Sequence, residues 1–194
     1  MEKQLQIMGK ERLGAFIDAV LAIVMTLLVL TLDKPKTYDW QGLWGLRISF
    51  LAYSLTFFRL GMLWVNIHFF YHLIKQVSQK TVWSTLVMLF FTSFFPYTTQ
   101  LLATHFHNGV MQAFYGIIFL GINLSVLWYF RTLDEVNENA KLHELTKRRN
   151  QWMAWDIAIK VVGLLLSLTV FSEGVILSDM IALIVIVVPR QLKH

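Results

Sequence analysis

The feature that most constrains this chain is an apolar run near its N-terminus, residues 12–32, with the sequence RLGAFIDAVLAIVMTLLVLTL. A helix rises about 1.5 Å per residue, so roughly 20 residues cross the ~30 Å hydrocarbon core of a bilayer. This run is long enough to do so, yet it contains one carboxylate, Asp18. Because a charge inside a membrane is costly, Asp18 is either a functional group or a structural anchor.

The composition as a whole indicates a membrane protein. Hydrophobic residues make up 56% of the 194 residues, charged residues make up 15%, and the mean hydropathy is +0.56. A soluble domain of this length would be considerably more polar. The formal charge of +5 comes from basic residues scattered between apolar segments, so no nucleic-acid-binding surface is predicted. The absence of cysteine excludes disulfides, thiolate metal sites and cysteine nucleophiles.

Six apolar segments approach the length of a membrane span. They cover residues 13–32, 46–74, 82–102, 110–130, 152–171 and 175–188. The last is short and stops at Pro189, so it is expected to be tilted or partly buried against its neighbours. The sequence therefore predicts an all-α integral membrane protein in which six transmembrane helices form a single domain over residues 1–194.

The basic residues near the segment ends predict the orientation, because Lys and Arg are retained on the cytoplasmic side. Fifteen Lys and Arg residues lie between or beside the apolar segments. If the N-terminus is inside, 12 of them lie in the cytoplasm and three lie outside. The three are Lys34, Lys36 and Arg47. Both termini are thus predicted to be cytoplasmic. The polar connector at residues 132–151 is predicted to be a cytoplasmic helical extension whose basic run, residues 147–149, faces anionic lipid, or else a solvated connector.

The first segment has two different faces when it is drawn as a helix that turns about 100° per residue. One stripe carries Arg12, Phe16, Ala19, Ile23, Thr26, Leu27 and Leu30. Asp18 falls on the opposite side. Asp18 must therefore meet hydrogen-bond donors inside the protein, whereas the stripe faces lipid, a neighbouring helix or a symmetry axis. Periodicity alone does not choose among these three.

The second segment supplies donors for that carboxylate. Trp64 and His68 are four residues apart and share one helix face, and both rings carry N–H donors. We therefore predict a polar contact between Asp18 and these two rings. Arg59 and Asn66 lie on the opposite face, where Arg59 either extends to the membrane surface or finds a carboxylate.

The remaining intramembrane charges are predicted to form structural pairs. Asp156 and Lys160 are four residues apart and can pair on one helix face. Glu173 lies in the outer turn, and Asp179 lies one turn into the sixth segment, where a donor from a neighbouring helix is expected.

Enzymatic and metal-binding functions find no support in the sequence. It has no HExxH, GxSxG or P-loop motif and no paired intramembrane aspartates, and no cofactor is predicted. His105 and His107 flank Phe106 in an outer loop without a nearby carboxylate, so no metal site is predicted there. Pro96 is expected to kink the third segment.

These residues carry a resemblance to a known family. The motif RxxxFID at residues 12–18, followed by Ala22 and Ile23, resembles the RxxxFSD signature of prokaryotic homologues of the lysosomal potassium channel, transmembrane protein 175. The pair Trp64 and His68, the proline of the third segment and the six-segment topology agree with that family. One position departs from the signature, because Ile17 replaces its serine and removes a hydroxyl.

The resemblance implies a homotetrameric, weakly selective potassium channel in the plasma membrane of a prokaryote, permeable to K⁺ and other monovalent cations. The first helix of each subunit would line a central pore, and the chain has no TVGYG-like carbonyl filter. Ile23 would form the narrowest hydrophobic ring, with Leu27 and Leu30 as further layers and Thr26 as a polar layer. A structural network would comprise Arg12, Phe16, Asp18, Trp64 and His68.

Two other functions stay open at this level. The first is a proton- or cation-coupled carrier of small solutes, in which Asp18 and His68 bind the coupling ion. The second is a membrane scaffold that conducts nothing. The carrier would need a proton or ion gradient for flux, and reconstitution without any ion flux would favour the scaffold.

Overall fold

The computed structural model describes residues 9–183, and every regular element in that range is a helix. The elements are α1 (Lys10–Leu27), η1 (Leu28–Thr31), α2 (Trp40–Gly45), α3 (Arg47–Tyr71), α4 (Gln79–Ser93), α5 (Phe95–Thr104), α6 (Gly109–Val136), α7 (Ala140–Thr169) and α8 (Gly174–Ala182). The prediction of an all-α fold is confirmed for the described residues.

Five helical stretches within residues 9–183 are long and apolar enough to cross a membrane. They are Lys10–Thr31, Arg47–Tyr71, Gln79–Thr104, Gly109–Val136 and Ala140–Thr169. The sixth predicted span, residues 175–188, begins within α8, whose nine residues reach only about 13 Å. Residues 184–188 of that span lie outside the described residues, so the count of six stays a prediction.

The third span is two helices with a break between them. Helix α4 ends at Ser93 and α5 begins at Phe95, directly before Pro96. Proline has no N–H to donate and its ring clashes with the carbonyl four residues earlier, so it belongs in the first turn of a helix. The expected kink at Pro96 is therefore present as a change of helix at Phe94.

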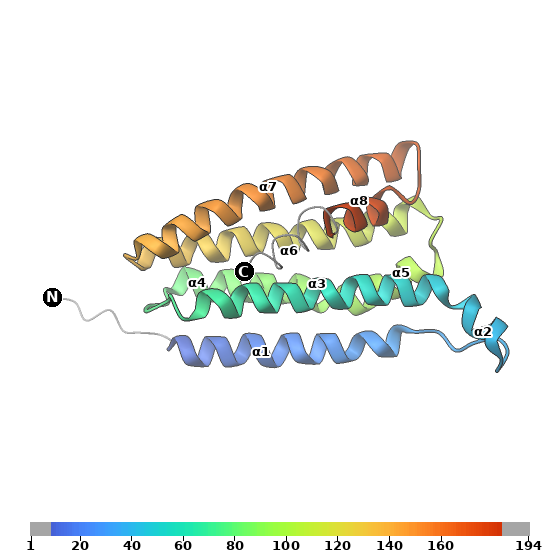
Figure 1. Cartoon of the computed structure of the whole chain (residues 1–194), viewed down its shortest axis with the longest axis horizontal. Helices are drawn as coiled ribbons and strands as arrows, with labels where there is room; N and C mark the ends of the chain where they lie inside the picture. Colours follow the sequence, from blue (N-terminus) through green and yellow to red (C-terminus); the bar gives the residue numbers. More distant parts are fainter. Residues whose placement is uncertain (1–8, 184–194) are drawn as a thin grey trace.

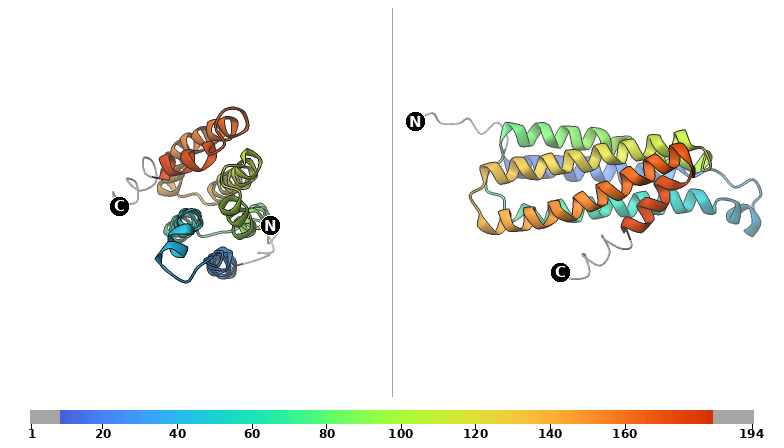
Figure 2. Two further views of the ribbon diagram at one scale, coloured as in Figure 1. Left: turned by 90° about the vertical axis from the view of Figure 1, so that its right-hand side faces the viewer. Right: turned by 90° about the horizontal axis from the view of Figure 1, so that it is seen from above.

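The long helices run side by side along the longest axis of the molecule (Figure 1). Helix α1 packs against α3, α4 and α5, and α6 packs against α4, α5, α7 and α8. Seen from the end, α1 and the pair α7 and α8 lie on opposite sides of the bundle (Figure 2). Asparagine side chains cap two of the long helices, since Asn108 accepts from the first turn of α6 and Asn139 from that of α7.

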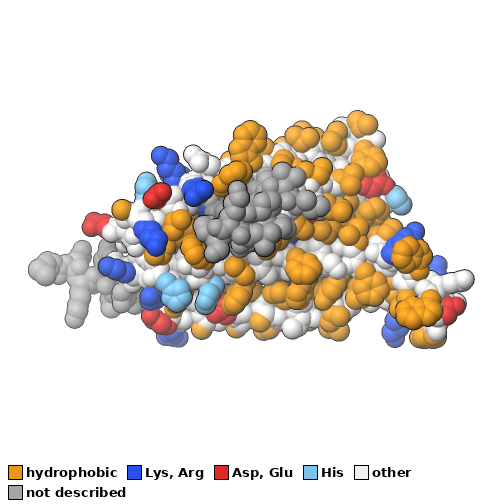
Figure 3. All heavy atoms as spheres, in the orientation of Figure 1, with side chains coloured by type: hydrophobic (Ala, Val, Ile, Leu, Met, Phe, Trp, Pro, Cys, Tyr) orange, Lys and Arg blue, Asp and Glu red, His pale blue; other side chains and the backbone are white. Residues whose placement is uncertain are grey.

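Side-chain chemistry along the surface follows the expected membrane boundaries. Hydrophobic side chains fill the middle of the face in Figure 3, and most Lys and Arg side chains gather at its two ends. One part of the interpretation of residues 147–149 is wrong, because Arg149 is 3% exposed and its guanidinium lies 3.5 Å from the centre of the Phe130 ring. The connector at residues 132–151 is helical at both ends, as predicted. Within its basic run, Lys147 and Arg148 face outward and Arg149 does not.

Candidate functional site

Helix α1 buries one face and exposes the other. The buried side chains are Leu13, Ile17, Leu21 and Val24, continued by Leu28 in η1. The exposed side chains include the predicted stripe, namely Phe16, Ile23, Thr26, Leu27 and Leu30. Ile23 is 58% exposed and Leu30 is 75% exposed. The chain thus presents an apolar strip of its first span that its own described helices do not cover.

The C-terminal end of this strip departs from α-helical geometry. Residues Leu28–Thr31 form a 3₁₀-helix, in which the Thr31 hydroxyl donates to the Leu28 carbonyl at 2.7 Å, and Leu32 is extended. Leu30 therefore lies in a tighter turn than the regular α-helix predicted from the sequence, although it remains exposed. Thr26 donates its hydroxyl hydrogen to the Ile23 carbonyl at 2.8 Å, which leaves its oxygen lone pairs as the polar feature of the strip.

Asp18 lies to the side of the strip and contacts α3. The indole Nε1 of Trp64 donates to Asp18 Oδ1 at 2.8 Å. His68 stacks on the Trp64 ring, with 5.2 Å between ring centres and an angle of 22°, and makes no hydrogen bond to Asp18. Arg12 is exposed and has no ion-pair partner within residues 9–183. Of the predicted polar contacts, the structure brings Asp18 and Trp64 together, with His68 behind the indole.

Ile17, the residue that departs from the RxxxFSD signature, is buried among apolar side chains. Ile17 is 1% exposed and belongs to the core cluster. An apolar side chain here packs between helices, where a serine would need a hydrogen-bond partner.

A second set of contacts, which no sequence pattern predicted, docks the N-terminal end of α1. The Lys10 ammonium donates to the Ile74 carbonyl at 3.0 Å and lies 5.2 Å from the centre of the Tyr71 ring. A Cβ atom added to Gly14 would stand 2.7 Å from that ring. A glycine at this point of α1 therefore lets α3 approach closely, and the lone glycine within the apolar run is its only signal in the sequence.

The largest group of buried charges lies on the other side of α3. Arg59 Nη2 is 2.7 Å from Asp179 Oδ1, and it donates to the Asp179 backbone carbonyl at 2.8 Å. Arg59 Nη1 is 3.6 Å from Asp156 Oδ1. Lys160 donates to Asp156 Oδ1 at 2.5 Å and lies 3.5 Å from Asp179 Oδ1. We call these four residues the buried quartet.

The buried quartet is formally neutral and joins three helices. Arg59 comes from α3, Asp156 and Lys160 come from α7, and Asp179 comes from α8, and each residue is less than 10% exposed. Asn123 of α6 adds a hydrogen bond to Asp156 Oδ2 at 2.8 Å. Two cations beside two carboxylates repay part of the cost of removing charge from water, whereas an unpaired charge here would not be tolerated. The sequence-predicted pairing of Asp156 with Lys160 is present, and the donor expected for Asp179 is Arg59.

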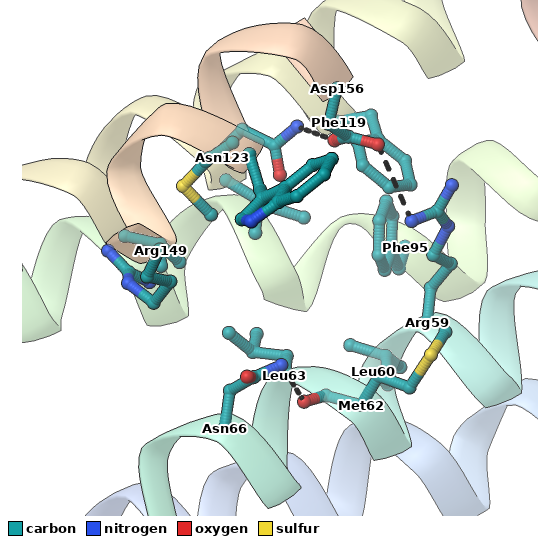
Figure 4. A pocket seen from close by; sticks show the side chains of 14 residues that line it. Arg59, Leu60, Met62, Leu63, Asn66, Phe95, Phe119, Asn123, Arg149 and Asp156 are labelled. Carbon is teal, nitrogen blue, oxygen red and sulfur yellow. Dashed lines mark hydrogen bonds and ion pairs between the residues drawn. The ribbon is translucent and has the colours of Figure 1, made fainter. Parts of the chain in front are cut away.

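A cavity of about 120 Å³ lies beside the quartet, between α3, α5, α6 and α7. Figure 4 shows Arg59 extending from α3 along one side of this cavity toward Asp156, with Asn123 bonded to the same carboxylate. Asn66 lies on the α3 side and donates to the Met62 carbonyl of its own helix. Most of the remaining lining is apolar, so polar groups face the cavity mainly at its α3 and α7 walls.

Comparison of the chain with known proteins identifies its family. The family model described as the endosomal/lysosomal potassium channel TMEM175 matches residues 12–96. A protein named as a potassium channel of Chryseobacterium sp. is 37% identical over 143 residues, which cover 71% of this chain and 72% of that protein. The chain belongs to the TMEM175 potassium channel family. The family is not enzymatic, and its members are membrane channels.

Other TMEM175 relatives agree. A potassium channel of Streptomyces collinus is 30% identical, covering 62% of this chain and 64% of that protein. A potassium channel of Chamaesiphon minutus is 31% identical, covering 73% of this chain and 76% of its own length. The fold resembles the crystal structure of a TMEM175 homologue from Chamaesiphon minutus with a TM-score of 0.67 and 24% identity, covering 90% of this chain and 96% of the other.

The range matched by the TMEM175 family model covers the whole Asp18–Trp64 contact but only part of the buried quartet. Residues 12–96 include Asp18 and Trp64, and they include Arg59 of the quartet. The quartet's other three residues, Asp156, Lys160 and Asp179, lie beyond the matched range.

The prediction that the histidines between α5 and α6 have no nearby carboxylate is wrong. The His107 Nδ1 contacts Oε1 of Glu173, which lies in the turn between α7 and α8. This hydrogen bond holds the pKa of Glu173 below its usual range, against the opposing effect of desolvation. His105 instead bonds Thr104, and no group of three metal-ligating side chains occurs within residues 9–183.

Proposed function

We propose that this TMEM175-family chain forms a homotetrameric, weakly selective potassium channel in which α1 of each subunit lines a central pore. The observation that carries the proposal is the uncovered strip of α1, on which Ile23, Thr26, Leu27 and Leu30 are exposed while Asp18 is held to the side by Trp64. The printed names of the relatives, all potassium channels, support K⁺ as the permeant ion.

The chemistry of the strip defines how selection would work. Rings of Ile23, Leu27 and Leu30 are hydrophobic constrictions, which control passage by dewetting and by stripping part of an ion's hydration shell. The Thr26 oxygen is the one side-chain ligand on the strip. Such a pore distinguishes K⁺ from Na⁺ by the cost of dehydration, so its preference for K⁺ is modest. In this arrangement both termini are cytoplasmic and the protein lies in the plasma membrane of a prokaryote.

The decisive experiment uses the fact that the chain has no cysteine. Ile23→Cys is reconstituted in liposomes, and K⁺ flux is followed while a water-soluble cationic thiol reagent is added. Modification and block of flux are expected, because a pore-lining thiol is in water. Leu165→Cys on α7 is the matched control, since both native side chains are 58% exposed in the single chain but Leu165 would face lipid.

The assembly is tested separately. The mass of the detergent-solubilised complex, corrected for bound detergent, should be close to four times the 22.6 kDa of one chain. An unreactive Ile23→Cys with unchanged flux would overturn the pore role of α1, and a monomeric mass would overturn the tetramer.

A further inference from the structure

Helix α3 stands between two parts of the molecule and is tied to each by a different side chain. On one side it packs closely against α1 and α5, whereas α6 packs mainly on α4, α5, α7 and α8. Between α3 and the pair α6 and α7 lies the cavity of about 120 Å³. Because a cavity gives α3 few contact atoms on this side, its distance from α7 is not fixed by close packing.

Arg59 spans this loosely packed side. Its guanidinium reaches from α3 to Asp179 on α8 at 2.7 Å and to Asp156 on α7 at 3.6 Å (Figure 4). The planar fork has several donors in fixed geometry, so it holds two carboxylates and a backbone carbonyl at once. The side chain is 8% exposed, and leaving the quartet would strand opposite charges inside the membrane region. Arg59 therefore fixes a spacing that the apolar contacts leave open.

The opposite side of α3 holds the pore-facing helix. Trp64 follows Arg59 by five residues, which places it about 140° around the helix and about 7.5 Å along it. There its indole donates to Asp18 of α1 at 2.8 Å. One rigid helix thus carries both the bond to α1 and the bond to α7 and α8.

We propose that Arg59 is a positioning residue for permeation: held by Asp179 and Asp156, it sets the distance of α3 from α7 and α8 and, through Trp64 and Asp18, the place of the α1 strip. This inference rests on the proposed pore role of α1. It differs from that proposal because Arg59 contacts no ion and acts only through the spacing of helices.

The test removes Arg59 without leaving a net charge. The double variant Arg59→Met with Asp179→Asn deletes one cation and one anion, so Asp156 and Lys160 remain as a neutral pair. The matched control is Lys80→Met with Glu135→Gln, which deletes an ion pair 3.6 Å apart whose lysine is 74% exposed. Both are made in a background with Phe58→Cys on α3 and Leu165→Cys on α7, and spin labels on these outward positions report the α3–α7 distance in liposomes.

Permeation is read in a second background. Each variant is combined with Ile23→Cys, and K⁺ flux and the rate of thiol modification are measured. The Arg59 double variant is expected to shift or broaden the α3–α7 distance and to change the modification rate about 2- to 30-fold, the range for mutations that act through a shared element. The control should leave both unchanged. Arg59→Lys keeps the charge with a shorter reach and should restore part of the native distance.

Several results would overturn the proposal. An unchanged α3–α7 distance would show that Arg59 does not set the spacing, and a changed distance with native modification rate and flux would show that the spacing does not govern the α1 strip. If both the double variant and Arg59→Lys fail to fold, Arg59 serves folding alone. If Ile23→Cys is unreactive with Arg59 intact, the pore proposal fails instead, and the distance measurement still decides whether Arg59 fixes the spacing.

Discussion

Two carboxylates, Asp18 in α1 and Asp179 in α8, are stabilised in opposite ways, and the contrast shows what each site is built to resist. Asp18 receives one neutral N–H from Trp64 and stays exposed on the surface of the single chain. Asp179 is 1% exposed and lies against two cations, Arg59 and Lys160. A single neutral donor gives direction with little energy, whereas opposed buried charges make displacement costly. The Asp18 contact therefore orients α1, and the buried quartet fixes the frame around it.

The largest expected effect comes from breaking the quartet on one side only. Asp179→Ala leaves two cations facing one carboxylate, and removing one member of a buried ion pair costs about 3–5 kcal/mol. Thermal unfolding of Asp179→Ala and the native chain in detergent measures this loss of stability. Asp179→Ala combined with Arg59→Met should recover most of the loss, and a double variant no more stable than the single one would show that packing, not charge balance, governs the site.

A smaller effect is expected at the other carboxylate. Trp64→Phe deletes the donor to Asp18 while keeping most of the ring, and because the site is partly exposed the loss should be about 1 kcal/mol, below the usual range for bonds to charged groups. Thermal unfolding of Trp64→Phe and Asp179→Ala in the same detergent compares the loss of stability at the two sites. An equal loss at both would contradict the contrast.

Asp18→Asn separates the channel from the carrier. The amide keeps an oxygen that accepts from Trp64, so the stability should change by less than about 1 kcal/mol and K⁺ flux should persist without a proton gradient. Flux assays in liposomes with and without an imposed pH gradient check this. Loss of all transport in folded Asp18→Asn protein would instead favour the coupled carrier that uses Asp18 and His68.

Whether α1 is docked by packing as well as by Asp18 is tested at Gly14. Gly14→Ala gains helix propensity of about 1 kcal/mol but places a methyl group 2.7 Å from the Tyr71 ring, and such overpacking costs about 1–3 kcal/mol. A net loss of up to about 2 kcal/mol is expected. Gly14→Ala with Tyr71→Leu should be more stable than Gly14→Ala alone, and the absence of recovery would place the strain elsewhere.

The smallest effect concerns pH at the turn between α7 and α8. The pKa of Glu173 is lowered by its hydrogen bond to His107, so its contribution to stability is fully present above the ordinary Glu pKa of about 4.3 and is lost as pH falls through the lowered value. The melting temperatures of the native chain and Glu173→Gln should differ slightly near neutral pH, and the difference should shrink as pH falls through the lowered pKa of Glu173. A difference that stays constant over the whole acid range would contradict this assignment.

Local spacing in the sequence predicted the contacts that lie within one helix or between two adjacent long ones. The four-residue spacing of Asp156 and Lys160 was sufficient, because side chains one turn apart share a face. The helical period predicted that the residues around Ile23 share one face, but only the structure shows that this face is exposed in the single chain. The hydrogen bond between Trp64 and Asp18 needed one further assumption, that the first two long spans are neighbours.

Contacts between distant segments were beyond that reasoning. Arg59 and Asp179 are 120 residues apart, and only the rotation of α3 in the assembled bundle brings them together. Likewise, His107 contacts Glu173 because the turn between α5 and α6 meets the turn between α7 and α8. The burial of Arg149 over Phe130 depends on how α6 and α7 cross. None of these follows from periodicity, which defines the faces of a helix but not the helix that each face meets.

The tight turn Leu28–Thr31 alters the geometry of Leu30, the last residue of the strip. A 3₁₀-helix advances about 2.0 Å and turns about 120° per residue, against about 1.5 Å and 100° in an α-helix. Over the three residues from Leu27, Leu30 is carried about 1.5 Å farther along the axis and about 60° farther around it than a regular helix would carry it. A regular α-helix continued through this segment would therefore misplace Leu30. Conversion between the two helix types at this point would reorient Leu30 and leave Ile23 in place.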